Sequence, residues 1–167
     1  MSRLDAHIAQ KIAQRDGLDF AARRLAGRGG VIVEFGLGKG RSYSHLVERF
    51  PGREVFCFDR RDATHPGWGP PPDHLYLGEF ADLLEDPAVH AAFGGRVLLA
   101  HLDLAFGESR DTRVHEFVVE RIHPWLAPGG LLLSDRPLAL RLVWGLARLQ
   151  TDVAHAERVP VYERPAP

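Results

Sequence analysis

The chain has 167 residues, of which 45% are hydrophobic and 26% are charged, a composition that is usual for one soluble globular domain. Its 21 basic residues nearly balance its 22 acidic ones, so neither nucleic acid nor an anionic membrane surface is indicated as a partner. No apolar stretch approaches the roughly 18 residues of a membrane span. The single cysteine, Cys57, excludes an intramolecular disulfide, is expected to be buried and fits a cytoplasmic location.

The N-terminal segment is predicted to be helical. Leu4, Ile8 and Ile12 recur at helical spacing, and a second short helix is predicted from Leu18 to Leu25, before a glycine-rich stop. We expect residues 1–28 to form a helical cap and residues 29–167 to form the core of a single domain.

Strands and helices then alternate along the chain. Strands are predicted at 31–35, 54–58, 74–77, 96–102 and 131–133, and helices or helical turns at 41–50, 79–93, 109–125 and 138–149. The tail 159–162 is predicted to be an edge strand, because Pro160 cannot donate to a ladder. This alternation predicts crossover connections and a mainly parallel sheet with helices on both faces, an α/β three-layer sandwich.

Polar residues and glycines stand where the predicted strands end. They are Glu34 with Gly36 to Gly40, Asp59, Gly78 with Glu79, Asp103 and Asp135. Parallel sheets bind ligands at the carboxyl ends of their strands. We therefore expect a binding crevice at this edge.

The glycines after the first strand run G-x-G-x-G, at positions 36, 38 and 40. A dinucleotide fingerprint would need a third glycine where Arg41 stands, and Glu34 lies where phosphates would pass. Glu34 suits a ligand that carries a cationic group instead.

The pattern VEFGLGKGRS, followed about 20 residues later by VFCFDR, resembles motifs I and II of class I S-adenosylmethionine-dependent methyltransferases. The segments LGEF (77–80), HLDLAFG (101–107) and LAPGGLLLSD (126–135) are similar to later motifs of that family. The resemblance covers residues 29 to 136 and implies a Rossmann-like fold with S-adenosyl-L-methionine as cofactor.

The resemblance also implies a set of cofactor-binding residues: Glu34, Gly36, Leu37, Gly38, Gly40, Ser42, Asp59, Arg60, Gly78, Glu79, Phe80 and Asp103. The glycines would let the backbone approach the methionine part, Asp59 would accept hydrogen bonds from the ribose, and Glu79 would lie near adenine. Each has an alternative. A tight turn explains one or two of the glycines, Asp59 could pair with an adjacent arginine, and Glu79 could cap the next helix.

Methyl transfer needs a base only when the acceptor is protonated. Asp103 is the best-placed candidate for base or acceptor orientation, with His101 two residues earlier, although Asp103 could instead cap a backbone N–H. The metal-dependent O-methyltransferases of this family have an Asp-Asn pair where this chain has Asp135-Arg136. An arginine cannot ligate a cation, so no metal is expected.

The predicted core has a shortened C-terminus, with room for one strand after Leu149, and no inserted substrate domain. A homo-oligomer that covers the exposed edge is therefore expected, and the acceptor is expected to be a small molecule. Two other functions stay open: a degenerate cofactor-binding module with a regulatory or structural role, and a nucleotide-binding oxidoreductase.

The loop RRDATHPGWGPPPD (60–73) is predicted to be a lid over the adenosine end of the cofactor. Trp68 would fold onto a flat ring or a substrate. The alternative is that Trp68 fills a hydrophobic gap between the second and third strands.

Overall fold

The computed structural model describes residues 2–104 and 112–166. Its strands are β1 (Val31–Phe35), β2 (Val55–Asp59), β3 (Leu75–Leu77), β4 (Val97–Leu102), β5 (Leu126–Ser134), β6 (Ala147–Arg148) and β7 (Val161–Glu163). Its helices are α1 (Arg3–Arg24), α2 (Arg41–Arg49), α3 (Phe80–Leu83), α4 (Pro87–Phe93) and α5 (Arg113–Ile122), with short 3-10 turns at Pro72–His74 and His123–Trp125.

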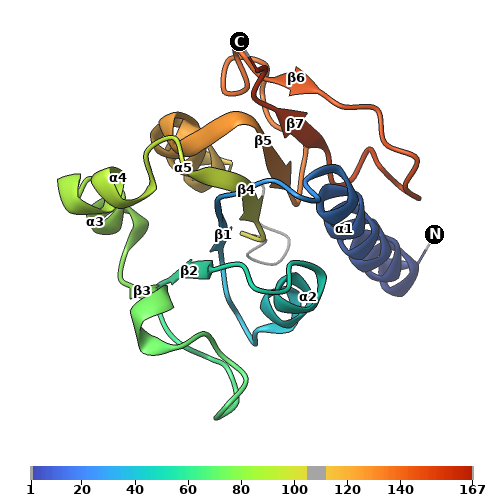
Figure 1. Cartoon of the computed structure of the whole chain (residues 1–167). Helices are drawn as coiled ribbons and strands as arrows, with labels where there is room; N and C mark the ends of the chain where they lie inside the picture. Colours follow the sequence, from blue (N-terminus) through green and yellow to red (C-terminus); the bar gives the residue numbers. More distant parts are fainter. Residues whose placement is uncertain (1, 105–111, 167) are drawn as a thin grey trace.

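The seven strands form one sheet in the order β3-β2-β1-β4-β5-β7-β6. β1 to β5 are parallel, whereas β7 is antiparallel to both of its neighbours. Figure 1 shows α1 and α2 on one face of this sheet and α3, α4 and α5 on the other. The predicted three-layer α/β sandwich is therefore confirmed.

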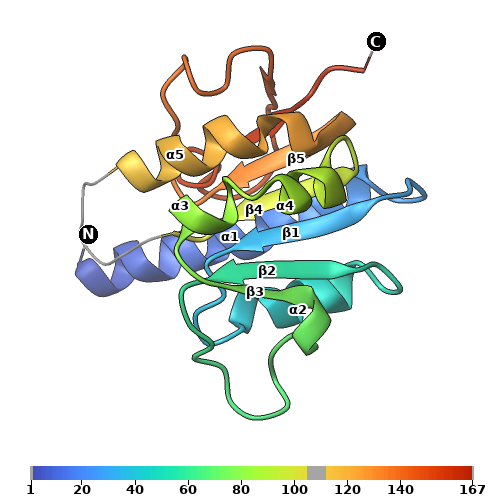
Figure 2. The same cartoon turned by 90° about the vertical axis from the view of Figure 1, so that its left-hand side faces the viewer.

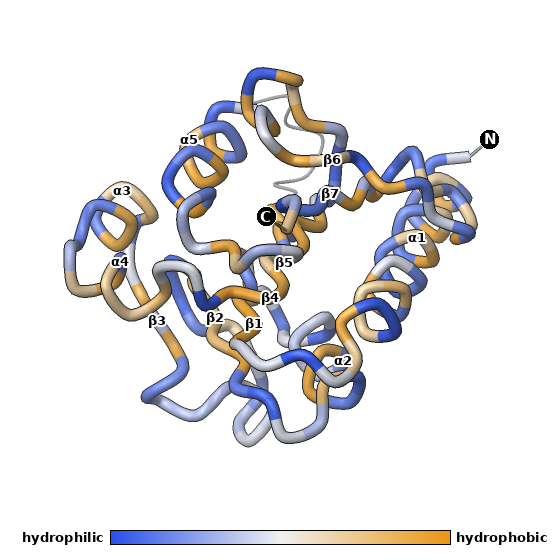
Figure 3. Tube along the Cα trace, turned by 45° about the horizontal axis from the view of Figure 1, so that its top comes forward, coloured by the Kyte–Doolittle hydropathy of each residue, from blue (hydrophilic) through white to orange (hydrophobic). Residues whose placement is uncertain are grey.

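Two hydrophobic clusters, one on each face, hold the layers together. The strands β1 and β4 are buried on both sides, which explains their uninterrupted apolar sequences. Figure 3 shows hydrophobic residues concentrated along the central strands. Cys57 is completely buried in the cluster beneath α1 and α2, as expected.

The N-terminal residues form one helix, α1, where two were expected. The side chain of Ser2 and that of Asp5 form a reciprocal capping box at its start. The predicted apolar stripe does not face the sheet, since Leu4 is 67% and Ile8 is 47% exposed. Small residues and Leu18 provide the buried face, because they allow the helix to approach the strands closely.

The C-terminal part differs from expectation in two ways. Residues 138–149 do not form a helix: they form turns and the short strand β6. Leu142 and Val143 are buried there, but Leu140 and Trp144 are exposed, so the helical spacing arose from an irregular packed segment. The tail strand β7 lies between β5 and β6, so it is not the edge strand.

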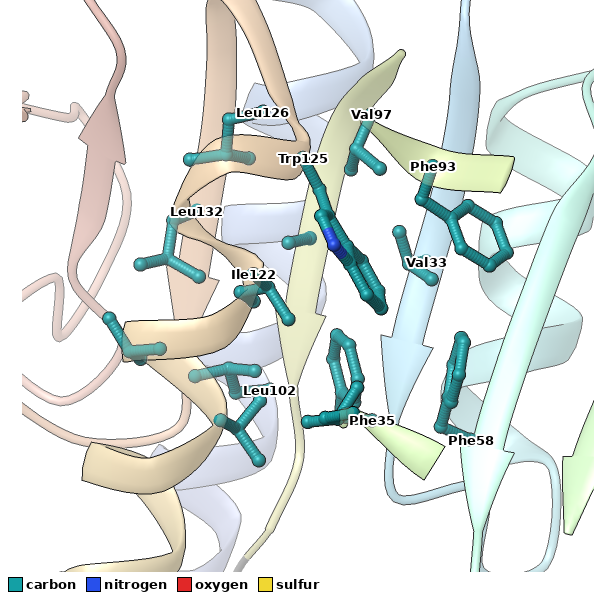
Figure 4. Packing of buried hydrophobic residues seen from close by; sticks show 14 of the residues in the cluster. Val33, Phe35, Phe58, Phe93, Val97, Leu102, Ile122, Trp125, Leu126 and Leu132 are labelled. Atoms are coloured by element: carbon teal, nitrogen blue, oxygen red, sulfur yellow. The ribbon is translucent and has the colours of Figure 1, made fainter. Parts of the chain in front are cut away.

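Trp125 organises the cluster beneath α4 and α5. Its side chain is 1% exposed, and its ring centroid lies 5.0 Å from that of Phe93 and 5.8 Å from that of Phe58 (Figure 4). Its indole N–H donates to Nδ1 of His90 at 2.9 Å. Both the apolar surface and the polar atom of this large residue are therefore satisfied.

We predict that Trp125→Ala lowers the free energy of unfolding by about 3–5 kcal/mol, because it leaves a large cavity and an unpaired His90 nitrogen. Urea unfolding measures this loss. The matched control is Trp144→Ala, since Trp144 is 83% exposed and should cost little. Equal, small losses in the two variants would contradict the assigned packing.

Candidate functional site

The carboxyl ends of the parallel strands meet at one edge, as the arrowheads of β1 and β2 indicate in Figure 2. The backbone N–H groups of Gly36, Asp103 and Asp135 each donate to a carbonyl of the neighbouring strand, at 2.9, 2.9 and 3.0 Å. These three residues and Asp59, the last residue of β2, therefore form one continuous row. The predicted row of strand-end residues is therefore present, and ligand binding along it stays a prediction.

The glycine loop after β1 adopts a backbone that favours glycine. Gly36, Gly38 and Gly40 have φ of 92°, 51° and 76°. A Cβ on Gly36 would lie 2.2 Å from the carbonyl oxygen of Asp103, whereas one on Gly38 would meet nothing within 4 Å. The turn therefore explains all three glycines, contrary to expectation. Gly38 is exposed and has open space beside it, and its contact with a cofactor stays a prediction.

Asp59 holds this loop in place. Its Oδ2 accepts hydrogen bonds from the backbone N–H groups of Leu37 at 2.8 Å and Gly38 at 3.0 Å. Its Oδ1 accepts one from the N–H of Arg61 at 3.3 Å. All three donors are backbone groups, and Oδ1, which accepts one bond, still has capacity for a ribose hydroxyl.

Glu34 and His101 form a buried pair beneath the row. Both side chains have zero exposure, and Nδ1 of His101 lies 3.0 Å from Oε1 of Glu34. Nε2 of His101 contacts the amide of Gln14 on α1 at 3.2 Å. Because both ring nitrogens have protein partners, this placement does not support His101 as a base; the contact of Glu34 with a cofactor stays a prediction.

The pKa of His101 is raised by its surroundings. Burial lowers it, but the hydrogen bond and charge of Glu34, together with the charges of Asp103 and Asp135, raise it more. The surroundings of His101 therefore favour the protonated imidazole more than water does.

Asp103 lies at the mouth of the site, with a side chain that is 20% exposed. The ammonium of Lys11 on α1 lies 3.6 Å from its Oδ2 and 2.8 Å from Oε1 of Gln14. Gln10, also on α1, donates to the carbonyl of Asp135 at 2.8 Å. Helix α1 therefore reaches over the ends of β4 and β5.

The remaining predicted residues flank this row. Glu79 is exposed and occupies the N-cap position of α3, as the capping alternative expects, although its side chain makes no capping hydrogen bond. Its contact with adenine stays a prediction. Phe80 packs partly into the core, with its ring centroid 6.0 Å from that of Phe35. Ser42 lies in the first turn of α2. Arg60 is exposed at the start of the 60–73 loop, which follows β2.

The 60–73 loop folds back toward the glycine loop. A Cβ on Gly40 would lie 3.1 Å from the carbonyl oxygen of Trp68, so the two loops are in contact. The indole of Trp68 is 67% exposed, which excludes the alternative that it fills a core gap. Its contact with a ligand stays a prediction.

His115 is a site residue that the sequence analysis did not identify. The residue is 2% exposed, and its Nε2 lies 2.6 Å from Oδ1 of Asp135.

No metal-binding group of three or more His, Cys, Asp or Glu side chains is found in residues 2–104 and 112–166. Two open hollows in this part of the chain lie elsewhere, between the second half of α1 and residues 150–154.

Comparison with known proteins shows the family. A model described as S-adenosyl-L-methionine methyltransferase matches residues 1–164, so the chain belongs to this family and its methyl donor is S-adenosylmethionine. The donor set fits that molecule: open space at Gly38 and a carboxylate, Asp59, beside it. No curated protein matches.

Solved structures of methyltransferases share the fold of this chain. The chain is 36% identical to an S-adenosyl-L-methionine methyltransferase from Silicibacter pomeroyi, with a TM-score of 0.87 over 98% of this chain and 99% of that one. A Burkholderia thailandensis 1,6-didemethyltoxoflavin-N1-methyltransferase is 14% identical, with a TM-score of 0.57 over 92% and 79%. A calicheamicin methyltransferase is 16% identical, with a TM-score of 0.62 over 89% and 77%; these last two show the fold alone.

The raised pKa of His101 predicts a pH-dependent contribution to stability. A folded pKa above the unfolded value of about 6.5 means that the stabilisation is complete below that pH and is lost as pH rises through the folded pKa. The difference in unfolding free energy between wild type and His101→Gln should therefore shrink toward alkaline pH. Urea unfolding at several pH values measures it; a difference that grows with pH would contradict the assignment.

Proposed function

We propose that this protein transfers the methyl group of S-adenosylmethionine to a small-molecule acceptor at the edge formed by β1, β2, β4 and β5. The observation that carries the proposal is the row of Asp59, Gly36, Asp103 and Asp135, with open space at Gly38. Relatives of the same fold support the class of acceptor. The toxoflavin enzyme was crystallised with a small molecule, 1,6-didemethyltoxoflavin, and S-adenosylhomocysteine.

In this proposal the sulfonium supplies an already activated methyl group. The protein has to bind and align the methyl donor and the acceptor and to exclude water. Alignment alone lowers the activation barrier by roughly 7–11 kcal/mol when the geometry is optimal. Asp59 would accept from the ribose hydroxyls, and the neighbouring loop amides would stay fixed by the same carboxylate. Glu79 and Phe80 would border the adenine.

The buried pair Glu34–His101 and the strand-end residue Asp103 would position the cofactor and the acceptor. Glu34 would hold the cationic methionine end from below, and His101 is a positioning residue that fixes the Glu34 carboxylate. Asp103, with Lys11 opposite it, would orient the acceptor. Helix α1 and the segment after Asp135 would form the acceptor side, with the 60–73 loop over the cofactor side.

We also propose a cytoplasmic homo-oligomer. The free, buried Cys57 suits a reducing compartment, and large apolar side chains are exposed at Leu4, Ile8, Leu140 and Trp144. No helix in the described part of the chain is long and apolar enough to cross a membrane. Analytical ultracentrifugation decides the assembly: a monomer across the concentration range would remove that part of the proposal.

Calorimetric titration tests the binding site directly. S-adenosylmethionine and S-adenosylhomocysteine should bind and NAD should not, because Arg41 stands in place of the third glycine of a dinucleotide site. Tight NAD binding without S-adenosylhomocysteine binding would refute the proposed function.

Asp59→Ala should weaken S-adenosylhomocysteine binding by about 1.5–3 kcal/mol, the range for hydrogen bonds to a charged group. The matched control is Asp62→Ala, which removes a nearby carboxylate that accepts hydrogen bonds from Thr64 within its own loop. This control variant should bind S-adenosylhomocysteine as the wild type does. Because Asp59 also fixes the glycine loop, circular dichroism first establishes that Asp59→Ala is folded. Unchanged affinity in the folded variant would give the carboxylate a purely structural role.

A further inference from the structure

A second buried pair lies beside the proposed acceptor side. Nε2 of His115 and Oδ1 of Asp135 are 2.6 Å apart, and the two side chains are only 2% and 3% exposed. Nδ1 of His115 and Oδ2 of Asp135 are buried and have no hydrogen-bond partner among the residues that the structure describes. Buried polar atoms are nearly always paired, so these two atoms call for a ligand or water.

The pair lies at the edge where the strands end. His115 is in the first turn of α5, and Figure 2 shows this end of α5 on the same side as the arrowheads of the parallel strands. Asp135 directly follows β5 and is bonded to the end of β4, next to Asp103. Arg136 is nearby, with Nε 3.8 Å from Oδ1 of Asp135.

The hydrogen bond to Asp135 determines what the free nitrogen can do. When Asp135 is ionised, its carboxylate can only accept, and Nε2 of His115 then carries the proton that it donates to Asp135. In the neutral imidazole, Nδ1 then carries a lone pair and no proton. A histidine held by a carboxylate, with its other nitrogen unpaired, can act as a general base, since the carboxylate also stabilises the cation formed on protonation.

We propose that His115, oriented by Asp135, is the base that removes a proton from the methyl acceptor, and that the acceptor group is a hydroxyl. The inference rests on the proposed methyl transfer. An uncharged amine can attack first and lose its proton afterwards, whereas a hydroxyl becomes a strong nucleophile only as its proton leaves.

The step balances without any further reactant. The acceptor oxygen forms a bond to the methyl carbon, the carbon–sulfur bond breaks and its electron pair stays on sulfur. The hydroxyl proton moves to Nδ1 of His115, which becomes a cation beside the Asp135 carboxylate. Release of this proton to solvent restores the neutral imidazole.

A purely structural clamp between α5 and β5 is the competing explanation. It would use only the bond between Nε2 of His115 and Oδ1 of Asp135. Glutamine can make the same bond with its side-chain N–H but offers no basic nitrogen. His115→Gln therefore preserves the clamp and removes the base, and His123→Gln, at a partly exposed position just after α5, is the matched control.

The first readout needs no acceptor. In protein labelled with ¹⁵N-histidine and saturated with S-adenosylhomocysteine, NMR at neutral pH should show His115 protonated at Nε2 and unprotonated at Nδ1. The signal is assigned by its loss in His115→Gln. A proton on Nδ1 would overturn the proposal.

The second readout follows radioactive methyl transfer from S-adenosylmethionine to simple probes: catechol and phenol, with aniline and a thiol for comparison. Transfer to a hydroxyl probe should fall about 100-fold or more in His115→Gln, as removal of a general base predicts, and stay unchanged in His123→Gln. Transfer that survives in His115→Gln, or that reaches only aniline or the thiol, would contradict the assignment.

Calorimetry separates this inference from the proposed function. S-adenosylhomocysteine should bind His115→Gln and wild type with closely similar affinity, because none of the proposed cofactor residues lies on α5. If the wild type does not bind S-adenosylhomocysteine, the proposed function fails. If it binds but His115 has the wrong tautomer, only the base assignment fails.

Discussion

The register of the parallel strands is the constraint on which the site depends. Phe35 lies opposite Phe58 on one side and Leu102 on the other, and Leu102 lies opposite Ser134. The next residue of each strand therefore falls in one row, and a slip of one residue would turn every polar side chain to the wrong face. Apolar burial on both faces of β1 and β4 fixes this register, so the core and the site are specified by the same residues.

Two buried acid–histidine pairs have different roles at this row: Glu34–His101 lies beneath it, and His115–Asp135 lies beside it. The Glu34–His101 pair is fully enclosed, and both of its histidine nitrogens have partners. In this pair His101 gives the buried side chain of Glu34 a hydrogen-bond partner, without which its burial would be costly. The His115–Asp135 pair leaves one nitrogen and one oxygen without a partner in the described residues, which is why it is the candidate for chemistry.

Much of the fold was predictable, because buried strands and amphipathic helices have distinct periodicities. The strand-end row followed from those strands, and the family motifs identified the cofactor. The helix predicted at 138–149 is wrong because Leu142, Val143 and Leu146 pack against the core at helical spacing without forming a helix. His115 lies on the same face of α5 as Val118, Val119 and Ile122, which are buried with it, so helical spacing could have indicated its burial. Its partner, Asp135, comes from a distant segment that spacing alone cannot bring near. The pairing of Glu34 with His101 required knowledge of strand order, which the sequence does not encode locally.

A crystal structure of the complex with S-adenosylhomocysteine tests the central claim most directly. We expect the ribose hydroxyls on Asp59, the methionine part against Gly38 and the sulfur facing the side of Asp103 and His115. A ligand bound away from this row, for example in the hollow lined by Asp16, Asp19 and Asp152, would contradict it.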